Sequence, residues 1–108
     1  MSLRNFYRKT TKIFKVELEF NDSVPELRAD TMSFILKKRR TDLDSEAYLT
    51  SEADMITEGG EGKAIFTLES DDLDLAPGPY FYEIKWFPDS SEYVLDSGIL
   101  TILDTVFD

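Results

Sequence analysis

LAPGPYFYEIKWF, residues 75–87, is the stretch of this sequence that decides its fold class. Two prolines around Gly78 predict a sharp chain reversal. After the reversal every second residue is large and apolar, which predicts a β-strand with one buried face: Tyr80, Tyr82, Ile84 and Trp86. A tyrosine directly after such a turn, at the start of the penultimate strand, predicts a tyrosine corner, in which the hydroxyl bonds to upstream backbone. We interpret Trp86 as a core residue on the same face.

The same two-residue period recurs along the chain. It predicts strands over 11–20, 31–37, 63–69 and 92–103, with short strands at 47–49 and 54–56. Gly98 predicts a bulge or kink in the last strand. About seven strands without an amphipathic helix predict an all-β fold, an immunoglobulin-like antiparallel β-sandwich with Greek-key connections. The 108 residues fit a single domain, 1–108, of which we expect residues 1–5 to be poorly ordered.

Histidine and cysteine are both absent from the chain. The sequence therefore lacks the base of a Ser-His-Asp triad, a thiol nucleophile and the usual ligands of zinc. A Ser–Lys pair or two carboxylates could still catalyse hydrolysis, but they need a cleft that a small sandwich rarely offers. Asp71, Asp72 and Asp74 fit turn capping better than acid–base work. We expect no catalytic, cofactor-binding or metal site.

Acidic residues alternate in the segment after the second predicted strand, as they do in a calcium loop: Asp42, Asp44 and Glu46. The calcium pattern also needs a glycine at its sixth position and a bidentate glutamate at its twelfth. Ala47 and Ala53 occupy those two positions here. We therefore predict that these acids are solvated loop residues.

Charge is distributed unevenly along the chain. The net charge is −10, yet residues 1–40 carry +5 and residues 41–108 carry −15. Such acidity argues against nucleic acid as a partner. Either basic strands lie beside acidic neighbours and cancel locally, or the molecule docks head-to-tail with an oppositely charged partner. The run 37–40, KKRR, is either an anion-binding patch or a strand end protected by charge from edge pairing.

Neither a secretory signal nor a membrane-spanning stretch is visible in the sequence, so we expect a soluble chain that is cytoplasmic on synthesis. Three apolar residues occupy nominally outward strand positions and are our candidate interface: Ile35, Ile65 and Phe81. Alternatively, loops or the N-terminal segment cover them. Exposed aromatic residues could instead bind carbohydrate, for which Tyr48, Phe87 and Tyr93 are the candidates.

Several motifs occur in a recognisable order. An aromatic–basic opening at 6–10 is followed by F-x-L at Phe66 and Leu68, by L-x-P-G-x-Y-x-Y-x-I at 75–84 and by S-G-x-L-x-I at 97–102. This order resembles the immunoglobulin-like N-terminal domains of upper baseplate proteins, and related small structural proteins, of tailed phages and prophages. The resemblance implies a non-catalytic module that packs against protein subunits, either copies of itself or other tail proteins. It further implies that an oligomer is possible and that the protein resides in the virion.

Overall fold

A computed structural model describes residues 5–19, 26, 27, 29–88 and 91–104 of the chain. Those residues confirm the predicted all-β fold and contain no α-helix, only two single 3₁₀ turns. The elements, in chain order, are β1 (Asn5–Tyr7), β2 (Lys12–Glu17), β3 (Thr31–Lys37), η1 (Asp44–Glu46), β4 (Leu49–Glu52), η2 (Gly59–Glu61), β5 (Lys63–Leu68), β6 (Gly78–Phe87) and β7 (Tyr93–Leu103).

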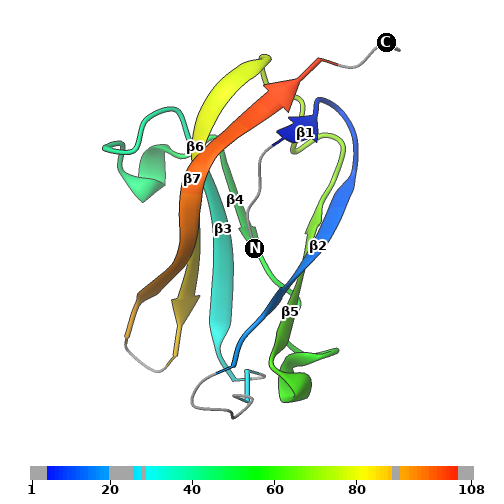
Figure 1. The fold of residues 1–108 in the computed structure, drawn as a ribbon, viewed down its shortest axis with the longest axis vertical. Coiled ribbons are helices and arrows are strands. Elements are labelled where there is room, and N and C mark those ends of the chain that lie inside the picture. The colour runs from blue at the N-terminus through cyan, green and yellow to red at the C-terminus, as the bar shows by residue number, and fades with distance from the viewer. Residues whose placement is uncertain (1–4, 20–25, 28, 89–90, 105–108) are drawn as a thin grey trace.

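The strands form two facing layers (Figure 1). One layer has the order β1-β7-β6-β3-β4, and the other is the pair β2-β5. The chain passes between layers after β1, β2, β4 and β5, which places β3, β6 and β7 opposite β2 and β5 as in immunoglobulin-like sandwiches. The expectation of a purely antiparallel arrangement was wrong at one edge, because β1 pairs with β7 in parallel.

Strand boundaries follow the two-residue period closely at β3 and β5 and less closely elsewhere. The two short strands expected at 47–49 and 54–56 are replaced by one strand, β4, between them. Asp54 makes only an isolated bridge to Ile65. Strand β1 was not predicted, because three residues are too few to show a period. Of residues 1–5, for which we expected poor order, residues 1–4 lie outside the described part and Asn5 begins β1.

The bulge in the last strand lies at a different residue from the one predicted. Gly98 pairs regularly with Tyr82, whereas the register of β6 and β7 shifts between Ile84 and Lys85, where Leu95 is the extra residue of β7. The glycine serves a close approach instead: a Cβ at Gly98 would stand 3.4 Å from the ring of Tyr82. The absence of a side chain there therefore reflects packing against an aromatic ring.

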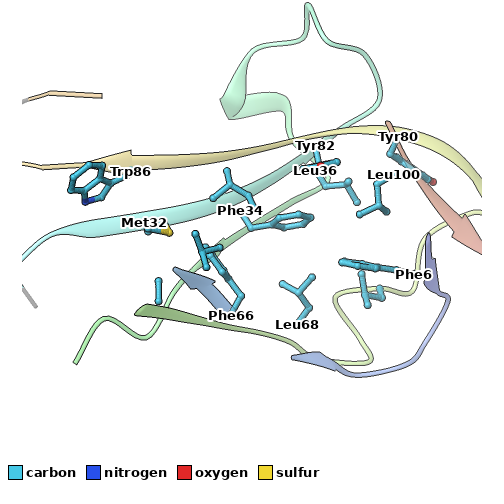
Figure 2. Packing of buried hydrophobic residues seen from close by; sticks show 14 of the residues in the cluster. Phe6, Met32, Phe34, Leu36, Phe66, Leu68, Tyr80, Tyr82, Trp86 and Leu100 are labelled. Atoms are coloured by element: carbon cyan, nitrogen blue, oxygen red, sulfur yellow. The ribbon is translucent and has the colours of Figure 1, made fainter. Parts of the chain in front are cut away.

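The core between the layers is organised around aromatic rings (Figure 2). The ring of Phe34 on β3 lies within 6.4 Å, centroid to centroid, of four other rings, which belong to Phe6, Phe14, Phe66 and Tyr82. These rings come from five different strands of both sheets. Trp86 is buried at one end of the core, as predicted. Its indole N–H donates to a carboxylate oxygen of Asp30 at 3.0 Å, which satisfies the polar atom that the ring carries inward.

The predicted tyrosine corner is confirmed. The hydroxyl of Tyr80 donates to the carbonyl oxygen of Ala76 at 2.6 Å, four residues upstream, and so fixes the connection that returns from β5 to β6. Burial, with a smaller contribution from Tyr48, raises the pKa of Tyr80, so the hydroxyl stays a donor. Gly78 adopts φ 141°, in the region that side chains disfavour, which explains the glycine between two prolines.

We predict that Tyr80→Phe lowers the free energy of unfolding by about 1–3 kcal/mol, because the carbonyl of Ala76 loses its donor in a partly buried place. Tyr48→Phe is the matched control, since that ring is largely exposed. Urea unfolding followed by tryptophan fluorescence measures both variants. Equal stability of Tyr80→Phe and the unmodified chain would show that the corner hydrogen bond contributes nothing net.

Candidate interaction surface

Two of the three candidate interface residues, Ile35 and Phe81, face outward from the five-stranded sheet but are not exposed. Their exposed fractions are only 4% and 8%, and neither belongs to the core between the sheets. The β3–β4 connection, which contains η1, lies on this outer side of the sheet, away from β2 and β5 (Figure 1). The guanidinium of Arg40 lies 5.9 Å from the ring centroid of Phe81. For these two residues the structure therefore favours the alternative to an open patch, in which a loop covers them.

The third candidate, Ile65, lies on the outward face of β5 and is half-buried. Its cross-strand neighbour on β2 is Lys15, and its main chain bonds to that of Asp54. Ile65 is therefore not brought together with Ile35 and Phe81, which belong to the other sheet. The three residues do not make one surface.

An ion-pair network fastens the β3–β4 connection to the outer face of the sheet. The ammonium of Lys37, on a side chain that is only 5% exposed, lies 2.7 Å from a carboxylate oxygen of Glu83 and 2.7 Å from one of Asp44. The other oxygen of Asp44 lies 2.7 Å from the ammonium of Lys85, and Glu92 approaches Lys85 at 3.5 Å. Asp44 thus bridges two lysines of neighbouring strands.

The charges of this network are stabilised by one another. Hydrogen bonds from Lys37, then from Lys85, hold the pKa of Asp44 below its ordinary value. Burial alone would lower the pKa of Lys37, but the hydrogen bonds to Asp44 and Glu83 outweigh it and raise the pKa. Asp44 is an exposed residue of the connection, as we predicted, but its ion pairs with two lysines were not predicted. Lys37 does not guard a strand edge, because β3 is flanked by β4 and β6.

We predict that Asp44→Asn lowers the free energy of unfolding by about 1–2 kcal/mol at neutral pH, because two lysines lose a charged acceptor. A group whose pKa is depressed by folding stabilises the protein above its unfolded pKa and loses that contribution as pH falls through the folded pKa. The gap in unfolding free energy between the unmodified chain and the variant should therefore narrow as the pH falls below about 3.9, the ordinary pKa of an aspartate.

Urea unfolding at a series of pH values measures this gap. Asp71→Asn, at an exposed acid of the β5–β6 connection, is the control and should show no such convergence. A gap for Asp44→Asn that stays constant down to the lowest pH would exclude the carboxylate charge as its source.

Ion pairs also join the basic first part of the chain to the acidic second part. Arg8 lies 2.9 Å from Asp74, and Lys15 lies 2.8 Å from Glu58. Together with the ion pairs of Lys37, these contacts favour the interpretation in which basic and acidic side chains cancel one another locally. They do not favour a molecule with two oppositely charged ends. The remainder of the basic run, residues 38–40, is exposed beside aromatic rings, and the ammonium of Lys38 lies 5.2 Å from the ring centroid of Tyr80.

Large apolar side chains are exposed at several places, among them Ile13, Leu43 and Ile56, and two further ones lie on the outer side of β1 and β7. Ile99 is 62% exposed and Tyr7 is 55% exposed, and the half-buried Leu103 pairs with Tyr7 across the two strands. We call these three residues the β1–β7 strip. The sequence analysis did not predict this strip, because it did not predict β1. Without β1, nothing in the sequence indicates that Tyr7 lies beside Leu103.

No family model and no curated protein matches this chain. Among the residues that the structure describes, no three acidic side chains gather closely enough to hold a metal ion. Within the same residues, no helix has the length and apolar character that crossing a membrane requires.

Proposed function

We propose that this chain is a non-catalytic structural module that binds protein subunits. The observation that carries the proposal is the β1–β7 strip, where two large apolar side chains stand more than half exposed on adjacent strands. Exposed apolar side chains on one face of a sheet favour burial against a partner. The main polar cluster on the same outer face, around Lys37, is internally paired and serves to hold a loop.

We further propose that the module is a tail or baseplate-type component of a phage or prophage, located in the virion after synthesis in the cytoplasm. The support is the resemblance of the 75–84 and 97–102 motifs together with the immunoglobulin-like strand order. The partners would be copies of this chain or other tail subunits, without nucleic acid and without a membrane. The acidic net charge agrees with protein partners rather than phosphate backbones.

A carbohydrate-binding or adhesion module is the second candidate. The pair Trp86–Tyr93, with ring centroids 5.7 Å apart, and the pair Tyr48–Tyr80, at 5.6 Å, each expose one aromatic ring. Tyr80 and Trp86 are six positions apart on β6, which is roughly 20 Å along a strand. The two aromatic pairs therefore do not form one platform. Phe87 is half-buried. Binding on a glycan array that disappears with Tyr93→Ala would favour this candidate over a subunit-packing role.

We predict that Ile99→Glu weakens association of the chain with itself or with its tail subunit by tenfold or more, since a charge would be desolvated in an apolar contact. The fold should be unaffected, because the side chain is mostly exposed. Light scattering and analytical ultracentrifugation measure the association. Thr67→Glu, on an exposed position of the other sheet, is the control. Unchanged association of Ile99→Glu would remove the strip as the interface.

We also predict that the chain is present in purified virions. Prophage induction, density-gradient purification of the particles and quantitative mass spectrometry test this directly. A fixed copy number relative to a tail protein is expected. Absence of the chain from intact particles would contradict the virion assignment while leaving a protein-binding role to be judged by the Ile99→Glu result.

A further inference from the structure

The two sides of the sandwich are built differently. On one side the layers are joined by main chain: the N–H of Asp54 donates to the carbonyl of Ile65 at 2.7 Å, and the N–H of Ile65 donates back at 3.0 Å. On the other side, in the part of the chain that the structure describes, no pairing joins β2 to β7. Strand β1 pairs only with 101–103 of β7, so residues 93–100 extend beyond it. We call the opening between β2 and this part of β7 the seam.

The edge of β2 turns main-chain groups toward the seam. The N–H of Leu18 donates to the carbonyl of Gly62 at 2.9 Å, which extends the ladder to β5. Polar groups alternate in direction along an antiparallel strand. Residues 12, 14 and 16 therefore point toward β5, and Ile13, Lys15 and Glu17 point their N–H and C=O groups away from it. An edge of this kind is a template for a further strand.

A cavity of about 420 Å³ lies in the seam. Val16 and Leu18 of the β2 side, Ile84 of β6 and Leu95 of β7 supply its apolar walls. The one carboxylate from β7 is that of Asp96, which accepts from the hydroxyl of Tyr82 at 2.8 Å and from the N–H of Ser97 at 3.0 Å. Lys15 and Glu17 of β2 also line the cavity, so it combines apolar walls with charged side chains from both strands, and the carboxylate of Asp96 is held in a fixed orientation.

A second cavity of about 380 Å³ also has Leu95 in its lining. Its other walls are Trp86, Pro88, Tyr93 and Val94, which are all apolar or aromatic. The bulge that makes Leu95 the extra residue of β7 places this side chain in the lining of both cavities. The seam thus offers apolar and charged side chains beside a strand edge that, among the described residues, has no pairing partner.

We propose that the seam receives an extended segment of a partner protein, which adds to β2 as a strand. Main-chain bonds to Ile13, Lys15 and Glu17 hold the segment, and its alternate apolar side chains enter the two cavities. A basic side chain of the segment faces Glu17 and Asp96. A second copy of the domain is a poorer occupant, because two β2 edges brought together would place two β7 strands in the same space.

The inference rests on the proposed function in assuming a protein partner, but it uses a different surface from the β1–β7 strip. The probe is a library of displayed twelve-residue peptides, selected on the full chain and counter-selected on Glu17→Pro. Proline at Glu17 removes an N–H that points into the seam and leaves the ladder to β5 intact. Thr67→Pro is the matched control, because it removes an N–H that points away from β2 on the opposite edge of the same sheet.

Selected peptides should alternate apolar and polar residues and bind the unmodified chain and Thr67→Pro equally. They should bind Glu17→Pro tenfold or more weakly. On the unmodified chain they should slow hydrogen exchange at the amides of Ile13, Lys15 and Glu17, a measurement that needs no variant to fold.

Failure to enrich any peptide over the counter-selection, or protection of amides elsewhere, would overturn the proposal. The light-scattering result with Ile99→Glu is independent of either outcome. The seam can therefore fail while the strip holds, and the reverse is equally possible.

Discussion

Contact between the ring of Phe34 and the four rings around it is the interaction on which this fold depends. Phe34 stands at the middle of β3, and its neighbours come from β1, β2, β5 and β6. A 108-residue chain without disulfides has to derive its stability from a core of this kind. Because the rings interlock at tilted and stacked angles, the two sheets have one relative position in which the cluster closes. The seam between β2 and β7 follows from that position.

The outer face of the five-stranded sheet shows how a loop can replace a partner. Ile35 and Phe81 are apolar on a face that an isolated sheet would leave in water, and the β3–β4 connection covers them. A buried lysine is costly unless its charge is matched. The charge of Lys37 is matched by Glu83 from its own sheet and by Asp44 from the loop. The ion pairs therefore hold the loop in place, and the loop in turn shields the apolar residues from water.

The two sides of the sandwich differ, and this difference explains why an acid, Asp96, occupies an inward position of β7. Asp96 pairs with the fully buried Ile84, a place that in a closed sandwich would exclude a carboxylate. The carboxylate is tolerated because β2 does not cover this part of β7 at the seam. In addition, the hydroxyl of Tyr82 donates to one carboxylate oxygen and the N–H of Ser97 donates to the other. On the opposite side, main-chain hydrogen bonds between Asp54 and Ile65 join the layers.

The sequence alone determined β2, β3, β5, β6 and β7, the face of each of these strands that enters the core, the tyrosine corner and the interior place of Trp86. Those features depend on neighbours one, two or four residues apart, which a two-residue period and a proline–glycine turn encode directly. Only the tertiary structure decided that β1 pairs in parallel with β7 and that Leu95 rather than Gly98 bulges. It also decided that Asp44 reaches Lys37 and Lys85 and that Ile35 and Phe81 are covered. Each of these depends on contacts between residues far apart in the chain, for which a single sequence carries no local pattern.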